Sequence, residues 1–245
     1  MYDLFIKELK SFLTSLIGYI VITVFLVTTG LFLWVFPMDY NILDARYANV
    51  TGLFMIAPFV FLFLIPAITM RSFADEKKSG TLEFILTQPL SEWAIILAKY
   101  LAGLVLVLFS ILPTFIYVIT VYYYGLPQGN IDMGATWGSY IGLLFLGGSF
   151  VAIGVFSSSL TDNQIVSFII SVFLSLFAYL GFEFIYSLDL FGKIDLFIRS
   201  LGIHAHYTSL SRGVIDTRDV VYFLSFIGFF LLLTKLSLES RKWEK

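Results

Sequence analysis

The sequence predicts an all-α polytopic membrane protein with six transmembrane helices. Hydrophobic residues make up 59% of the 245 residues and charged residues only 13%, and the mean hydropathy is +0.92. A soluble domain of this size cannot bury so much apolar surface, so the long uncharged runs indicate membrane spans. Six such runs use most of the chain. They leave one membrane domain, residues 1–245, and no room for a separate soluble domain.

Residues 2–16 predict an amphipathic helix that lies in the membrane interface. Its apolar side chains recur at helical spacing, and its other side carries Asp3, Lys7, Glu8 and Lys10. A signal peptide is the alternative, because Lys7 and Lys10 precede an apolar run. That run is too long for a signal core, and no small-x-small cleavage site follows it.

The six predicted spans cover roughly residues 16–36, 51–70, 94–124, 134–160, 163–182 and 219–238. Pro58 and Pro66 are expected to bend the second span. In the fourth span Gly134, Gly138 and Gly142 stand at four-residue spacing, which permits close helix packing.

A polar stretch, Arg71–Lys99, separates the second span from the third. It holds eight charged residues, whereas the 20 residues before it and the 25 after it hold none. Gly80 can close the preceding helix, because glycine tolerates the left-handed conformation. Thr81 is then expected to cap a short helix that ends before Pro89.

The same stretch predicts a second cap, with Ser91 before the third span and Glu92 in its first turn. A solvated loop is the plain alternative for so many charges. It does not account for two caps, two helix breakers and the apolar triplet Phe84–Leu86 within so few residues.

The pattern in this stretch comprises Arg71, Ala74, Asp75, Glu76, Gly80, Thr81, Leu82, Glu83, Leu86, Thr87, Pro89 and Lys99. It resembles the first cytoplasmic loop of the export-type ABC transporter permeases, the ABC-2 membrane family. In that family the loop, residues 71–93 here, carries a coupling helix that sits in a cleft of an ATPase subunit. The resemblance implies ATPase docking by Asp75, Glu76, Gly80, Thr81, Leu82, Glu83, Phe84 and Leu86.

The six-span layout extends the resemblance to nearly the whole chain. It also implies a name for the first helix, an elbow helix that leads into the first span. Among subfamilies the chain looks most like the gliding-motility-associated permease. That likeness implies a second membrane subunit with a large periplasmic domain.

Residues 183–218 depart from simple loop composition. Ile194, Phe197, Ile198 and Leu201 line one face of a predicted helix, which indicates amphipathic helices in the outer leaflet before the last span. In the family that the chain resembles, such helices close an outer gate. Phe197, Leu201 and His204 are the gate candidates.

Loop charges predict that both termini are cytoplasmic, and the resemblance implies that the membrane is a bacterial inner membrane. With this orientation, ten of the fifteen basic residues lie on the inner side.

The chain shows no nucleotide-binding or catalytic motif. Gly192-Lys193 lacks the other residues of a phosphate-binding loop, so ATP and Mg²⁺ are expected in a partner subunit and no cofactor in this chain. His204-x-His206 can be read as a metal pair, but no cysteine or acid lies close in sequence, and no metal site is expected. No nucleic-acid partner is expected either.

The sequence is compatible with two functions. The preferred one is the membrane subunit of an ATP-driven exporter. In this complex two six-span subunits, identical or related, lie in the lipid bilayer, and two ABC ATPase subunits bind to them from the cytoplasm. The other is a scaffold that uses ATP to assemble envelope proteins and moves no solute. An ion-coupled carrier is disfavoured, because the predicted spans hold no Asp, Glu, Lys, Arg or His except near their ends, at Lys99, Asp219 and Lys235.

Overall fold

The computed structural model describes residues 1–45, 47–87, 90–189 and 192–240, and in these ranges it contains helices and no strand. Among them, six helical stretches are long and apolar enough to cross a membrane: Leu16–Trp34, Thr51–Lys78, Glu92–Tyr124, Met133–Leu160, Gln164–Ser187 and Thr217–Ser240. The predicted fold class, an all-α polytopic membrane protein, is confirmed.

The α-helices of the described chain follow one another with few long connections. In order they are α1 (Tyr2–Thr14), α2 (Leu16–Trp34), α3 (Thr51–Thr69), α4 (Ala74–Lys78), α5 (Thr81–Thr87), α6 (Glu92–Ile111), α7 (Phe115–Tyr124), α8 (Met133–Leu160), α9 (Gln164–Leu176), α10 (Phe182–Ser187), α11 (Asp195–Ser200), α12 (Ile203–Leu210) and α13 (Thr217–Ser240).

The helix α8 is the most buried of the six spanning stretches, and α3, α6, α9, α12 and α13 all pack against it. Glycines on α8 allow close approach. A Cβ added at Gly154 would lie 1.9 Å from Thr69 Oγ1 of α3, and one at Gly147 would lie 2.7 Å from Val107 Cγ1 of α6. These contacts hold α3 and α6, the helices before and after the polar loop, against α8.

A sharp turn at Ser15 separates α1 from α2. The Ser15 backbone is extended, and its hydroxyl accepts a hydrogen bond from Gly18 N at 3.3 Å, which caps α2. A Cβ at Gly18 would lie only 2.4 Å from the Phe12 carbonyl oxygen, so glycine permits this close turn. As a result α1 leans against α6 instead of continuing the line of α2.

Pro58, which the sequence predicts to bend α3, is linked to a contact with another helix. Pro58 has no backbone N–H, so the carbonyl of Phe54, four residues earlier, has no donor within α3. The Tyr207 hydroxyl on α12 donates to that carbonyl at 2.7 Å. This hydrogen bond holds α12 against the first half of α3.

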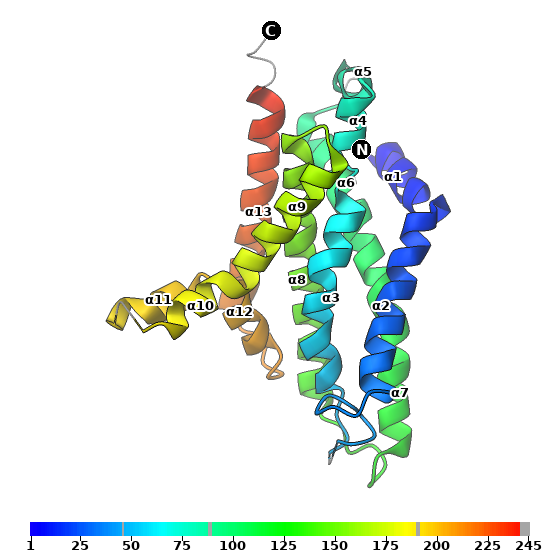
Figure 1. The fold of residues 1–245 in the computed structure, drawn as a ribbon, viewed down its shortest axis with the longest axis vertical. Helices are drawn as coiled ribbons and strands as arrows, with labels where there is room; N and C mark the ends of the chain where they lie inside the picture. The colour runs from blue at the N-terminus through cyan, green and yellow to red at the C-terminus, as the bar shows by residue number, and fades with distance from the viewer. Residues whose placement is uncertain (46, 88–89, 190–191, 241–245) are drawn as a thin grey trace.

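Two spanning stretches change helix type along their length. A 3₁₀ turn, Leu112–Thr114, contains Pro113 and joins α6 to α7. A π-helical stretch, Phe177–Gly181, joins α9 to α10, and α10 and α11 then extend to one side of the bundle (Figure 1). Apolar side chains of this arm, including Phe184 and Leu196, are exposed.

The bundle has two distinct ends. The helices α1, α4 and α5 gather at one end, towards which the last turns of α13 also run (Figure 1). We call this end the loop end. At the far end lie the connection between α2 and α3 and the connection between α7 and α8 (Figure 1).

Candidate functional site

The polar loop begins with a turn that a serine from another helix holds in place. The Ser158 hydroxyl on α8 accepts hydrogen bonds from the backbone N–H groups of Phe73, at 2.8 Å, and Ala74, at 3.0 Å. The same hydroxyl donates to the Met70 carbonyl at 3.0 Å. The buried backbone between α3 and α4 therefore obtains its partners from α8.

The short helix α4 is bound to the corner between α8 and α9. Asp75 accepts a short hydrogen bond from Gln164 Nε2, and its carboxylate lies 3.6 Å from Arg71 Nε. Lys77 Nζ donates to the Ser159 carbonyl at the end of α8. Asp75, one of the expected docking residues, thus also anchors α4 within the chain.

A group of three charges lies below α4, with the ammonium buried and the two carboxylates partly buried. Lys99 Nζ is 2.7 Å from Glu76 Oε1 of α4 and 3.1 Å from Glu8 Oε1 of α1, and it lies 5.1 Å from the Phe73 ring centroid. The Lys99 side chain is 1% exposed. We call Glu8, Glu76 and Lys99 the charge triad. It joins α1, α4 and α6 with one ammonium shared between two carboxylates.

Sequence reasoning placed one member of the triad differently. Glu8 was expected on the polar side of α1 with Asp3 and Lys7, but it turns inward to Lys99. Lys99 ends the polar stretch and falls in the predicted third span, residues 94–124, and the structure places it in α6. The spacing of residues in α1 shows which side is polar, but not which polar residue meets a buried ammonium.

Gly80 and the short helix α5 form the tip of the loop. Gly80 has φ 71°, the left-handed conformation that the sequence predicted for it. Thr81 was expected to cap α5 from the position before the helix, but it is the first residue of the helix. Its hydroxyl lies 2.8 Å from the Ser79 hydroxyl. As predicted, the Ser91 hydroxyl caps α6, accepting from Ala94 N at 3.2 Å.

The two faces of α5 differ. Leu82 and Ile85 are buried in the core of this chain, whereas Phe84 is 69% exposed and Glu83 is also at the surface. Leu82 therefore holds α5 to its own chain, and Phe84 is the large apolar side chain that α5 presents outward. Leu86 lies in α5, but its side chain and Pro89 fall outside the described residues.

A cleft of about 560 Å³ separates α1 from α5. Leu4 and Lys7 line it from α1, and Phe84 and Ile85 line it from α5. We call it the α1–α5 cleft. An exposed aromatic side chain at a cleft of this kind is suited to receive a partner protein.

Comparison with family models identifies one match over nearly the whole chain, the ABC-2 family transporter protein, at residues 2–240. The chain belongs to the ABC-2 transporter family. Members are membrane subunits of ABC transporters and pair with a separate ABC ATPase subunit. Comparison with curated proteins gave no match.

The predicted glycine column of this ABC-2 permease lies at the far end of α8. A Cβ at Gly138 would lie 2.4 Å from the Leu210 carbonyl oxygen, and one at Gly142 would lie 3.3 Å from Leu210 Cβ. At Gly134 the nearest such atom is a side-chain oxygen of Asp132, at 3.3 Å. Gly138 and Gly142 therefore face α12, whereas Gly134 has more room.

The gate candidates of the permease lie on two different helices. Phe197, on α11, and Leu201, just after it, are exposed. His204 lies on α12, with Nδ1 3.8 Å from Glu183 Oε2 and its ring edge-on to Tyr179. Their gate role stays a prediction.

His206 takes part in a contact that the sequence did not indicate. Its Nδ1 is 2.6 Å from Asp219 Oδ1 at the start of α13, its Nε2 is 2.8 Å from the Ser200 carbonyl oxygen, and its ring stacks on Tyr222. A carbonyl oxygen only accepts hydrogen bonds. Nε2 therefore donates to Ser200, and Nδ1 makes the second contact, with Asp219.

Proposed function

We propose that this chain is the membrane subunit of an ATP-driven export complex, in which α5 docks into a separate ATPase subunit. The loop end is then cytoplasmic, with both termini, and the membrane is the inner membrane of a bacterium. Two six-span subunits, identical or related, form the path through the membrane. Two ATPase subunits supply the ATP and Mg²⁺ sites.

The observation that carries this proposal is the contrast between the two faces of α5. Leu82 and Ile85 fix the helix to the chain, and Phe84 stands exposed beside the α1–α5 cleft. A solvated loop has no need of an anchored helix with an outward aromatic side chain. A helix that transmits force to the membrane needs both.

The contacts of α4 support a route for that force. When ATP closes the ATPase subunits, they displace α5, and α4 moves with it. Ser158 connects this unit to α8, and Lys99 connects it to α6 and, through Glu8, to α1. The spanning helices beside the loop would therefore move together, which alters the path at the far end.

Replacement of Phe84 by Asp tests the docking directly. A charge buried without a partner costs several kcal/mol, which weakens binding about a hundredfold or more at about 1.4 kcal/mol per tenfold. Because Phe84 is exposed in the chain alone, the variant should reach the membrane at a normal level. It should no longer co-purify with the ATPase, and cells should lose the activity of the complex.

The matched control on the same helix is Glu83→Ala, which removes a charge in the first turn worth up to about 1 kcal/mol. It should retain most of the ATPase. Full retention of the ATPase by Phe84→Asp would show that α5 is not the docking helix, and the exporter proposal would lose its main support.

The orientation has its own test. A cysteine at Asn130, in the connection at the far end, should react with an impermeant thiol reagent in spheroplasts, and one at Ser79 should not. Labelling at Ser79 under these conditions would reverse the proposed orientation.

Transport and scaffolding are separated by activity in the reconstituted complex. An exporter shows ATPase activity that its substrate stimulates, and it accumulates a compound inside inverted vesicles. A scaffold does neither. The likeness to gliding-motility permeases adds the expectation that a second membrane subunit, with a large periplasmic domain, co-purifies with this one.

A further inference from the structure

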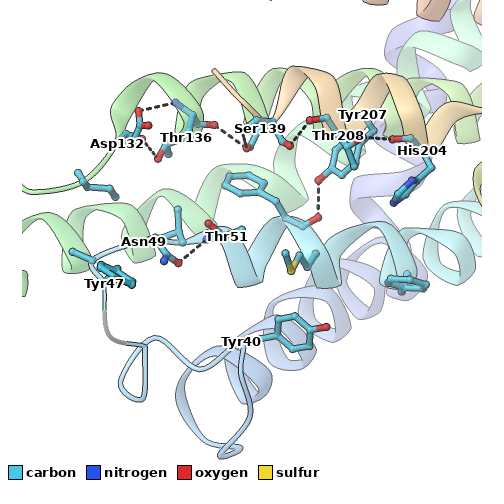
Figure 2. Close-up of a pocket in the computed structure, with 18 of the residues that line it drawn as sticks. Tyr40, Tyr47, Asn49, Thr51, Asp132, Thr136, Ser139, His204, Tyr207 and Thr208 are labelled. Atoms are coloured by element: carbon cyan, nitrogen blue, oxygen red, sulfur yellow. Dashed lines mark hydrogen bonds between the residues drawn. The ribbon is translucent and has the colours of Figure 1, made fainter. Parts of the chain in front are cut away.

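A cavity of about 630 Å³ lies at the far end of the bundle, between elements that the docking proposal does not use. Figure 2 shows its two sides. One side is formed by hydroxyl-bearing residues of α8 and α12, such as Thr136 and Thr208. The other side is formed by Tyr40, from the connection between α2 and α3. We call this space the far cavity. Its volume suits a small molecule.

The hydroxyl side of the far cavity can accept hydrogen bonds but has few protons left to donate. Thr136 donates its proton to the Asp132 carbonyl at 2.7 Å, Ser139 to the Ala135 carbonyl at 2.8 Å, and Thr208 to the His204 carbonyl at 2.9 Å. A hydroxyl has one proton and two lone pairs, so each oxygen offers the cavity only an acceptor. A ligand that binds along this side must therefore bring the donors.

The charges of the lining residues restrict the class of ligand further. Asp132 is the carboxylate among the described residues that line the cavity, and none of those residues is Lys or Arg. No Lys or Arg would pair with an anionic group there, and the lining histidine, His204, already faces the Glu183 carboxylate, so burying an anion is costly away from water. The cavity therefore favours a ligand without net negative charge.

A second hollow continues from the far cavity along α2 and α3. It has a volume of about 450 Å³ and shares Tyr40, Met55 and Phe59 with the far cavity. Most of its remaining lining is apolar, including Val24 and Phe63. We call it the apolar groove. A molecule that occupies both spaces must be polar at one end and apolar at the other.

We propose that the far cavity and the apolar groove together bind one amphiphile. Its head is rich in hydrogen-bond donors and carries no net negative charge, and its apolar chain lies along α2 and α3. A sugar head, through its hydroxyl groups, and an amine head, through its N–H groups, both meet these two requirements. The inference deepens the proposed export function by naming a class of cargo, and it rests on that function only in so far as the amphiphile is exported.

Photo-crosslinking to the purified chain in phosphatidylcholine nanodiscs tests the binding, without ATPase or ATP. Three probes carry the same diazirine-bearing acyl chain: a glucosyl lipid, a long-chain amine and a phosphatidylglycerol. Labelled positions are mapped by peptide mass spectrometry. The glucosyl lipid or the amine, whichever supplies the natural head chemistry, should label α2 and α3 at the apolar groove, and phosphatidylglycerol should not.

Variants that keep shape but remove acceptors give the specific control. Ser139→Ala with Thr208→Val should lower labelling at the groove about tenfold, because two hydrogen-bond acceptors are lost. Thr120→Val is the matched control, since Thr120 makes the same bond within its own helix, to Ile116 at 2.8 Å, but does not line the cavity. It should leave labelling unchanged.

Three results would overturn the inference. Equal groove labelling by phosphatidylglycerol would refute the donor-rich, non-anionic head. Labelling spread evenly over lipid-facing helices, unaffected by the double variant, would show that the cavity binds nothing. A disulfide between two copies of Phe63→Cys, with no probe labelling, would show that a second copy covers the groove. Failure of ATPase docking leaves all three results unaffected, so the two proposals fail separately.

Discussion

Lys99 and Glu76 form an ion pair, with 2.7 Å between Nζ and Oε1, that joins the first turns of α6 to the base of the polar loop. Glu8 completes the triad from the first helix of the chain. One ammonium compensates two carboxylates, and Glu76 Oε2 is buried without a hydrogen-bond partner. The triad therefore depends strongly on its single cation.

Replacing Lys99 by Met should destabilise the protein by about 3–5 kcal/mol, because it leaves two carboxylates buried without a counter-charge. The midpoint of thermal unfolding in detergent, followed by tryptophan fluorescence, measures the effect. Adding Glu8→Gln and Glu76→Gln should recover most of the loss. If Lys99→Met unfolds at the wild-type temperature, the triad is not a closed ionic contact.

Replacing Ser158 by Ala should loosen the turn between α3 and α4. The N–H groups of Phe73 and Ala74 would lose their acceptor in a buried place, at about 1–3 kcal/mol. Hydrogen exchange should become faster at these two amides. The neighbouring Ser157, also buried, bonds only to Ile153 of its own helix, so Ser157→Ala should change exchange there little. Equal exchange in both variants would contradict the assignment.

Replacing Gly138 by Ala should disturb the contact of α8 with α12, because the new Cβ would lie 2.4 Å from backbone. Such overpacking costs about 1–3 kcal/mol. Gly134→Ala meets only the end of a side chain at 3.3 Å and gains up to about 1 kcal/mol of helix propensity. Unfolding temperatures should therefore move in opposite directions, and a matching fall in both would argue against close packing at Gly138.

Replacing His206 by Phe should cost more stability than replacing Asp219 by Asn. The first change keeps the ring on Tyr222 but leaves the buried Asp219 carboxyl without its hydrogen-bond partner, at about 1–3 kcal/mol. The second leaves an amide in that place and an imidazole that can still donate to Ser200, at about 1 kcal/mol. Comparison of thermal unfolding decides, and the reverse order would mean that the contact with His206 does not stabilise Asp219.

Much of the fold follows from local pattern. Uncharged runs of spanning length predicted six helices, and the Ser91 and Gly80 signals act within a few residues of the structure they determine. In each case the cause and the effect lie in the same short segment, so a single sequence is sufficient.

The site was less predictable, because its contacts join distant segments. Glu8 and Lys99 are 91 residues apart, and nothing in the spacing of either helix indicates the other. Leu82 and Phe84 are both apolar residues of α5, yet one is buried and the other exposed. The orientation of such a short helix depends on what it packs against, which the sequence of the helix does not contain.

The hydrogen bond from Tyr207 to Phe54 has a consequence for how these residues can change over time. Because Pro58 has no backbone N–H, the Phe54 carbonyl lacks a donor within α3 and accepts its hydrogen bond from the Tyr207 hydroxyl. A lineage that lost the proline would satisfy the carbonyl within α3, and Tyr207 could then become Phe at little cost. A lineage that kept the proline and lost the hydroxyl would leave a buried backbone acceptor without a partner. Residues 58 and 207 should therefore be inherited as a pair, with the proline as the condition for the tyrosine.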